Sequence, residues 1–242
     1  MNKHGLRNWG FKCLLLIFAF AQLVACTSSS DTYSTKALIV WDGSADVTEN
    51  AALTNLNTLM TGVGYTVTTN IGIPAGKLSG YGQIWDIRYL EALSGTDESS
   101  YKTYLEKEGT LVLTGGYSST TGRDASIITL ITDFGGGPIT LSNSSTEQAQ
   151  TVEPEFASPY TVNDVNYTYG NPIVDGTTTA GRGTFITEYS STFGSAILYA
   201  RGTLSGITAG KLIVVFDTNF LNFSSNPDAA DFYDLTVNML FL

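Results

Sequence analysis

Apolar and polar residues alternate in blocks along the chain from residue 37 onward. The uninterrupted apolar run ALIVW at residues 37–41 predicts a strand covered on both faces. The stretch ENAALTNLNTLMTGVG at residues 49–64 has leucines at helical spacing and glycines at its end, which predicts a helix. Alternating strands and helices indicate a parallel sheet with helices on its faces. By the same criteria we predict strands over 65–70, 81–90 and 110–116 and helices over 95–109 and 124–137, with Thr96 or Asp97 capping the helix at 95–109.

The pattern changes in the second half of the chain. Residues 139–205 are rich in Thr, Tyr, Val, Asn and Gly, which predicts short strands joined by turns. The segment KLIVVFD at 211–217 returns to a buried strand, and residues 226–242 predict a closing helix. We therefore expect one α/β domain over residues 37–242, interrupted by a β-rich insertion at about 139–205.

The first residues have the pattern of a secretory signal. Basic residues and no acid precede the apolar run CLLLIFAFAQLVA, which is short for a membrane span. The run ends in LVAC, which resembles the lipobox of bacterial lipoproteins, whose cysteine is acylated with chains such as palmitate. We expect residues 1–25 to be a signal peptide, Cys26 to carry the lipid, and residues 26–36 to form a polar tether. A plain signal peptide with an incidental cysteine and an uncleaved anchor helix are the alternatives.

The same resemblance implies a location. In lipoproteins, an Asp directly after the lipidated Cys retains the protein at the inner membrane. Thr27 occupies that position here, which implies the outer membrane if the cell has one. We therefore expect a lipid-anchored protein of the cell envelope that faces the periplasm or the surface.

Cysteine and histidine are confined to the first 26 residues. The two cysteines are Cys13 and Cys26, and the single histidine is His4. A mature chain that begins at a lipidated Cys26 has no free thiol, no disulfide and no imidazole. This excludes the usual general base, the Ser-His-Asp triad and the commonest transition-metal ligand. We expect neither a metal nor a cofactor.

The chain is acidic, with 12 Lys and Arg against 22 Asp and Glu and a formal net charge of −10. Three of the 12 basic residues precede Cys26, so a mature chain would have nine against 22 and a net charge of about −13. Such a surface repels nucleic acid and anionic lipid headgroups. We expect no nucleic-acid partner, and the charge suits cations or neutral ligands.

Four segments, in this order, resemble the class I glutamine amidotransferase-like fold: ALIVWDG, YGQIWDIRYL, GTLVLTGGYSS and KLIVVFDTNFL. They are more similar still to secreted bacterial proteins that share its flavodoxin-like plan. The resemblance covers most of the chain after the tether and is weakest in the insertion. It implies a flavodoxin-like parallel sheet with helices on both faces. In the family's enzymes, a Cys occupies a G-x-C-x-G turn between a strand and a helix.

The corresponding turn departs from that pattern. It reads GYSST at residues 116–120, so Ser118 replaces the Cys and Thr120 replaces the second Gly. The family's catalytic His has no counterpart after residue 26, and we therefore expect no amidotransferase reaction. The turn also resembles the G-x-S-x-G elbow of serine hydrolases, but a serine hydroxyl needs a base to act as a nucleophile. Ser118 is then a turn-lining or ligand-binding hydroxyl or, alternatively, a nucleophile activated by Lys or Asp.

Polar side chains follow four of the predicted strands. In open parallel sheets, ligands bind beyond the carboxyl ends of the strands, so these side chains would meet at one edge. A set of Asp, Arg, Ser and Asn suits hydrogen bonding to a polyol, a sugar or a carboxylate. Each also has a structural interpretation, because Asp can cap a helix, brace a turn or pair with a nearby Arg. The candidates are Asp42, Asp86, Arg88, Ser118, Arg123, Asp124, Asp217 and Asn219.

Two functions fit this set. The first is a non-catalytic, lipid-anchored envelope protein that binds a small polar ligand, a glycan or a protein partner at the sheet edge or on the insertion. The second is a carboxylate-dependent hydrolase or sugar-processing enzyme that uses Asp42, Asp86 and Asp217. Two of these carboxyls within about 5–10 Å of each other in a cleft would favour the enzyme, whereas an Asp–Arg pair locked together away from any cleft would favour the scaffold.

Overall fold

A computed structural model describes most of the chain after residue 33. Ser34–Leu242 forms one compact unit. The expected signal peptide, Cys26 and Ser118 all lie outside the described residues. The described ranges are 34–44, 46–76, 78–88, 90–116, 122–142, 148–168, 172–174, 183–189, 193–223 and 228–242.

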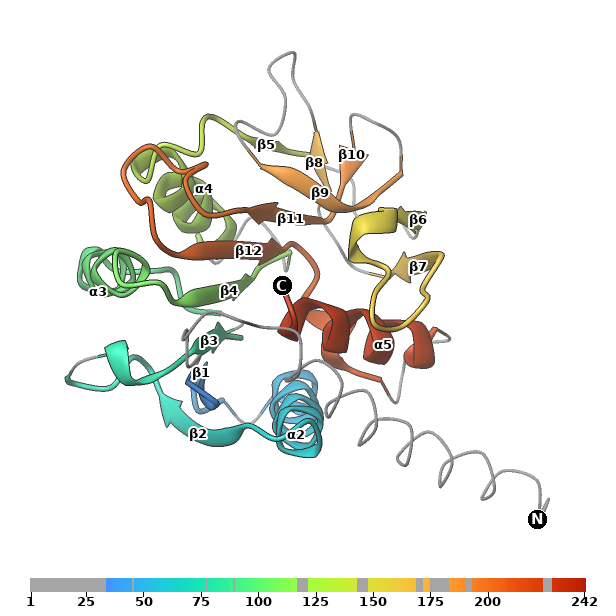
Figure 1. Ribbon diagram of the computed structural model, residues 1–242, viewed down its shortest axis with the longest axis horizontal. Helices are drawn as coiled ribbons and strands as arrows, with labels where there is room; N and C mark the ends of the chain where they lie inside the picture. Colours follow the sequence, from blue (N-terminus) through green and yellow to red (C-terminus); the bar gives the residue numbers. More distant parts are fainter. Residues whose placement is uncertain are drawn as a thin grey trace, which may run out of the picture. The chain divides into compact units, whose positions relative to one another are not determined.

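Parallel strands form one half of a nine-stranded sheet, whose order is β2-β1-β3-β4-β12-β11-β9-β6-β7. Every pairing among the first five strands of this order is parallel. The residues of β1, β3, β4 and β12 are buried on both faces, as the apolar runs of β1 and β12 predicted, whereas β2 at the edge of the sheet is mostly exposed (Figure 1). These strands are β1 (Lys36–Trp41), β2 (Thr66–Ile71), β3 (Gln83–Asp86), β4 (Thr110–Thr114) and β12 (Lys211–Val215).

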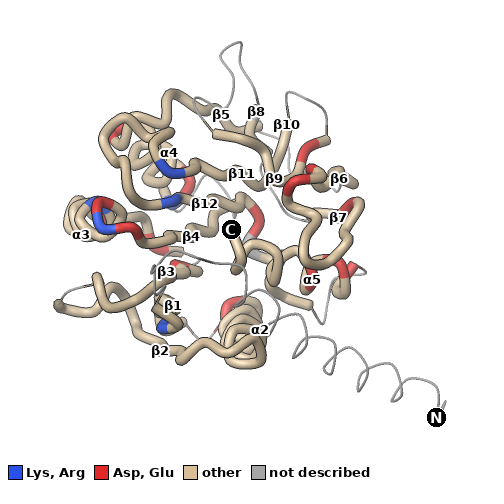
Figure 2. The backbone as a smooth tube through the Cα atoms, in the orientation of Figure 1, with Lys and Arg blue, Asp and Glu red and all other residues tan. Residues whose placement is uncertain are grey.

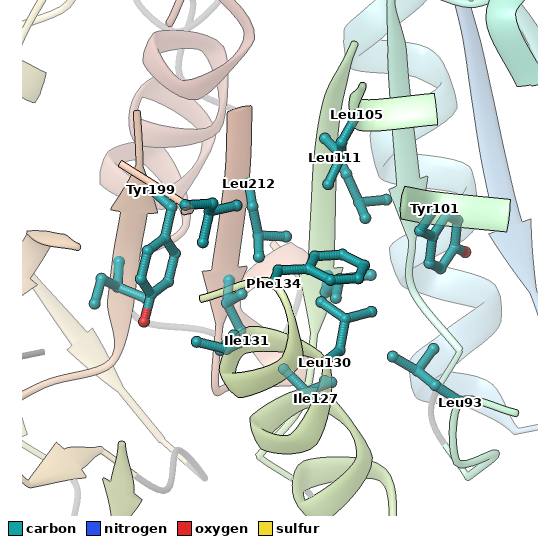
Figure 3. Close-up of a cluster of buried hydrophobic side chains, with 14 of the residues drawn as sticks. Leu93, Tyr101, Leu105, Leu111, Ile127, Leu130, Ile131, Phe134, Tyr199 and Leu212 are labelled. Carbon is teal, nitrogen blue, oxygen red and sulfur yellow. The ribbon is translucent and has the colours of Figure 1, made fainter. Parts of the chain in front are cut away.

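Helices cover both faces of this parallel half. On one face, α3 (Gly95–Leu105) and α4 (Arg123–Asp133) bury their apolar residues against β4 and β12 (Figure 3). On the other face, α2 (Val47–Gly62) and α5 (Ala229–Leu240) contact each other and cover the strands (Figure 1). The predicted fold class is thereby confirmed: an α/β, flavodoxin-like sheet with helices on both faces.

The helix α3 begins differently from the prediction. Its cap is Ser94, whose hydroxyl accepts a hydrogen bond from the Asp97 N–H at 3.2 Å, while the Asp97 carboxylate accepts one from the Ser94 N–H at 2.9 Å. The predicted cap at Thr96 or Asp97 is therefore wrong. Asp97 is the reciprocal partner in a capping box, three residues into the helix.

The β-rich segment between α4 and β12 extends the main sheet. Four of its strands continue the sheet beyond β12, and every pairing in this half is antiparallel. They are β11 (Ala196–Tyr199), β9 (Thr184–Glu188), β6 (Gln148–Val152) and β7 (Asp164–Tyr167). A separate small sheet contains β10 (Phe193–Gly194), β8 (Ile173–Val174) and β5 (Thr140–Leu141).

The parallel arrangement places the carboxyl ends of β1, β3, β4 and β12 at the same edge of the sheet. This edge therefore receives the loops that carry the candidate residues from four separate parts of the sequence. Within the described part of the chain, no helix has both the length and the hydropathy to cross a membrane.

Candidate functional site at the carboxyl edge of the sheet

The central group at this edge surrounds Asp86, the last residue of β3, which is fully buried. Arg88 Nε donates to Asp86 Oδ1 at 3.0 Å and to Oδ2 at 3.2 Å, and Arg88 Nη2 donates to Oδ2 at 2.7 Å. A guanidinium that holds both oxygens of a carboxylate forms a strong, charge-assisted pair. The candidates Asp86 and Arg88 therefore form a buried ion pair with each other.

Two helices reach the same carboxylate. The Tyr101 hydroxyl of α3 donates to Asp86 Oδ2 at 2.7 Å, and Arg123 Nη2 of α4 lies 3.1 Å from Asp86 Oδ1. Arg123 is itself buried and donates through Nε to the Thr114 carbonyl at the end of β4, at 3.1 Å. Asp86 thus joins β3, β4, α3 and α4 at one point.

The surrounding charges keep Asp86 ionised. Burial alone would raise the pKa of Asp86, but Arg123 and Arg88 outweigh it and lower that pKa from 3.8 to about 2. Burial and the Asp86 charge raise the pKa of Tyr101 well above 10.0, so its hydroxyl remains a donor. An ionised carboxylate with both oxygens engaged has neither a proton to give nor a free lone pair at neutral pH. We therefore assign Asp86, a candidate general acid–base residue in the sequence, to the scaffold.

Asp217, which follows β12, is also fully buried. Its Oδ1 accepts from the Asn219 N–H at 2.7 Å, which caps the short helix η3 (Thr218–Leu221). Its Oδ2 accepts from the Thr168 N–H at 3.0 Å, directly after β7. This carboxylate braces a turn and ties the parallel half of the sheet to the antiparallel half. The Asn219 side chain is partly exposed.

Asp124 holds the loop after β4. It lies in the first turn of α4 and accepts from the Gly116 N–H at 2.7 Å. Gly116 has a φ of 98°, and a Cβ there would lie 2.3 Å from the Phe216 carbonyl oxygen, so this position requires glycine. The loop that carries Ser118 thus starts from a fixed backbone, although Ser118 itself lies outside the described residues.

A second carboxyl, which the sequence analysis overlooked, lies beside Asp42. Glu49 is in the first turn of α2, is only 2% exposed, and accepts from the Asp42 N–H through Oε1 at 2.8 Å. Among the described residues, no group donates a hydrogen bond to Glu49 Oε2. Asp42 is partly exposed, and its Oδ1 accepts from the Ser44 N–H at 2.7 Å.

Glu49 has the opposite protonation state to Asp86. Burial first, and then the hydrogen bond to the Asp42 side chain and the negative charges of Asp42 and Asp46, raise the pKa of Glu49 from 4.5 to about 8. At neutral pH, Glu49 therefore carries a proton. A protonated carboxyl can donate a hydrogen bond, so in this state Glu49 is a donor to the neighbouring Asp42 side chain.

The structure thus sorts the candidates by their accessibility. Asp86, Arg88 and Arg123 share one buried network, while Asp124 and Asp217 brace loops. Of the described candidates, Asp42 and Asn219 are partly exposed. No group of three or more His, Cys, Asp or Glu side chains among the described residues is arranged to hold a metal ion.

Solved structures resemble this fold, whereas comparisons of the sequence find no match. No family model matches the chain, and no curated protein matches it. The N-terminal domain of mmIFT52 is similar over 85% of this chain and 97% of that one, with 13% identity and a TM-score of 0.63. A ThuA-like protein from Bacteroides uniformis matches over 89% and 93%, with 12% identity and a TM-score of 0.50. A glutamine amidotransferase from Thermotoga maritima matches over 86% and 96%, with 8% identity and a TM-score of 0.52.

At these identities the similarity defines the fold alone. The chain has the class I glutamine amidotransferase-like architecture that the sequence resemblance implied.

Replacing Asp86 tests the buried network. Asp86→Asn should lower the free energy of unfolding by about 3–5 kcal/mol, because the guanidiniums of Arg88 and Arg123 would stay buried without their shared negative charge. Urea unfolding of residues 34–242 measures the change. Glu91→Gln is the matched control, since Glu91 is 56% exposed and 3.6 Å from Arg88, and should cost less than about 1 kcal/mol. An Asp86→Asn variant as stable as this control would contradict the assignment.

Replacing Glu49 tests its raised pKa. The folded protein keeps a proton on Glu49 up to about pH 8, whereas the unfolded chain releases it near 4.5, so raising the pH between these values favours unfolding. This loss is at most about 1.4 kcal/mol per pH unit. Glu49→Gln should remove it, which makes the variant progressively more stable than the wild type as the pH rises to 8. Glu106→Gln, at an exposed position, should leave the pH profile unchanged. Parallel wild-type and Glu49→Gln profiles would show that Glu49 titrates normally.

Proposed function

We propose that this protein is a non-catalytic, lipid-anchored protein of the cell envelope that binds a small polar ligand, a glycan or a protein partner at the carboxyl edge of its sheet. The observation that carries the proposal is the state of the charged groups at this edge. They are already paired with one another and with backbone groups, and they form a rigid frame around partly exposed hydrogen-bonding side chains.

Binding accounts for this frame better than catalysis does. A binding site gains affinity when its polar groups are held in place before the ligand arrives. A catalytic site needs a group that exchanges a proton or attacks the substrate, and the candidates Asp86 and Asp217 are buried with both oxygens engaged. The sequence after Cys26 also contains no Cys and no His.

The chemistry of the edge favours a neutral, hydroxyl-rich ligand. The Asp42 carboxylate accepts hydrogen bonds, and the Asn219 amide both donates and accepts them. Sugars and polyols present hydroxyl groups that satisfy both types of partner. An anionic ligand would meet the repulsion of a chain with a net charge of −10.

The envelope location rests on the amino-terminal sequence. The basic start, the apolar run and the LVAC motif support acylation of Cys26, and Thr27 supports the outer membrane. The lipid would hold the protein at the membrane through its buried methylenes, without a spanning helix.

A carboxylate-dependent hydrolase is the second candidate, and one observation favours it. Glu49, whose pKa is raised to about 8, neighbours the Asp42 carboxyl, and a protonated carboxyl beside a second carboxyl is what an acid–base pair requires. Glu49 is only 2% exposed, so a substrate would reach it only through Asp42 or after the loop moves. This candidate differs from the carboxylate set expected from the sequence, because it replaces Asp86 and Asp217 with Glu49.

Acylation can be tested by labelling cells with a palmitate analogue. The wild-type chain should incorporate the label and sediment with membranes, while Cys26→Ser should do neither. Cys13→Ser is the control and should behave like the wild type, because Cys13 lies in the expected signal peptide. Label that persists in Cys26→Ser would contradict the anchor.

Ligand binding can be tested by thermal shift of residues 34–242 against sugars, polyols, carboxylates and divalent cations. A ligand at a hundred times its dissociation constant adds about 2.7 kcal/mol of stability. We expect a sugar or polyol to raise the melting temperature, and Asp42→Asn to reduce that shift by more than half. Asp164→Asn, exposed at the start of β7, should leave it intact.

The other outcomes separate the candidates. Binding that survives Asp42→Asn would place the ligand away from this edge and contradict the proposal. A bound sugar that is also hydrolysed, with turnover lost in Glu49→Gln, would favour the hydrolase.

A further inference from the structure

The strand β2 forms one edge of the nine-stranded sheet and pairs with β1 alone. The Thr66 N–H donates to the Thr35 carbonyl at 2.8 Å, and the Gly72 N–H donates to the Trp41 carbonyl at 2.8 Å. In a parallel pair, every second residue turns both its N–H and its C=O to the neighbouring strand. The even-numbered residues therefore face β1.

The odd-numbered residues Val67, Thr69 and Ile71 consequently turn their backbone groups away from the sheet. Within the described part of the chain, one of these outward-facing backbone groups has a hydrogen-bond partner: the Ile71 carbonyl accepts from Asn70 Nδ2 at 3.0 Å. Edge strands with free backbone groups are templates for pairing with another strand. In Figure 1, β2 is the outermost strand at the lower side of the sheet.

The sequence of β2 lacks the features that usually protect an edge. TVTTNI contains no charged residue and no proline. Most of its side chains are exposed, including Ile71 at 64%. Figure 2 shows no charged residue on this strand. In addition, no Asp or Glu occurs between Glu49 and Asp86, the longest acid-free interval after residue 31 in a chain with 22 acids.

We propose that β2 pairs with β2 of a second copy of this chain, in antiparallel orientation about a two-fold axis. Two acidic molecules repel each other unless they meet through uncharged surface, and β2 provides such a surface. A two-fold interface also requires a patch that is complementary to itself. The open edge meets this requirement in one specific register.

In that register, the two-fold axis passes beside Thr69. Thr69 then lies opposite Thr69 of the second copy, and Val67 lies opposite Ile71 of the second copy on each side. All three are outward-facing residues, so they form the hydrogen-bonded pairs of an antiparallel ladder. Their side chains share one face of the sheet, where Thr–Thr and apolar cross-strand pairs are both favourable. This dimer does not depend on the ligand proposed above.

A cysteine at the axis tests the register directly. Residues 34–242 form a compact unit without cysteine, so a single introduced thiol is the only one present. Hydrogen-bonded antiparallel pairs have Cα atoms about 5.5 Å apart, within the range of a disulfide. Thr69→Cys should therefore give a disulfide-linked dimer under mild oxidation. Thr58→Cys, exposed on α2, should remain monomeric. Failure of Thr69→Cys to cross-link would overturn the proposed register.

Sedimentation of the unlinked unit over rising concentration tests the dimer itself. One strand pair buries less surface than the roughly 1,600 Å² of a standard interface, so a weak, reversible dimer is expected. Thr69→Pro removes an outward N–H without removing a bond to β1, and should weaken the dimer at least tenfold. Thr69→Ser keeps the N–H and should dimerise like the wild type. A wild-type unit that stays monomeric at the highest concentration, or a Thr69→Pro dimer of undiminished strength in a folded variant, would overturn the proposal.

Discussion

The ionised carboxylate of Asp86 is the constraint on which the carboxyl edge of the sheet depends. It lies where β3 ends and receives two guanidiniums and a phenol from the loop after β3, from α4 and from α3. Burying two positive charges is costly unless a negative charge lies between them, and burying that negative charge is costly without its donors. The Asp86 carboxylate and the two guanidiniums can therefore be buried only together. This requirement holds the ends of β3, α3 and α4 together at the carboxyl edge of the sheet.

A second buried carboxyl at the same edge, Glu49, is protonated rather than ionised at neutral pH. In the part of the chain that the structure describes, Glu49 pairs with no cation and neighbours Asp42 instead, so it stays buried by keeping its proton. The contrast between Asp86 and Glu49 shows that burial alone does not decide the charge of a carboxyl; the sign of the nearest partner does. The same contrast distinguishes the two functions considered for this edge. The ion pairs around Asp86, whose hydrogen-bonding groups are all engaged, suit a binding site, whereas a protonated acid beside a carboxylate is what a hydrolase would need.

Much of the fold could be predicted because its determinants are local. Uninterrupted apolar runs identified the buried parallel strands, and the parallel topology brought their carboxyl ends to one edge. The cap of α3 was misplaced because Ser94, Thr96 and Asp97 are all capable caps, and only the backbone decides among them. Glu49 was overlooked because a Glu in the first turn of a helix is usually exposed. Its burial depends on the loop after β1, which the periodicity of the helix does not encode. The sequence also did not predict that the sheet continues through β11, β9, β6 and β7, because strand pairing depends on residues that are distant in sequence.

The most direct test of this account is a carboxyl ¹³C NMR titration of residues 34–242, with Asp86 and Glu49 assigned through their Asn and Gln variants. Asp86 should stay ionised down to about pH 2, and Glu49 should keep its proton up to about pH 8. If both carboxyls instead titrate near pH 4, as exposed ones do, then neither the ion-pair network around Asp86 nor the protonated state of Glu49 exists.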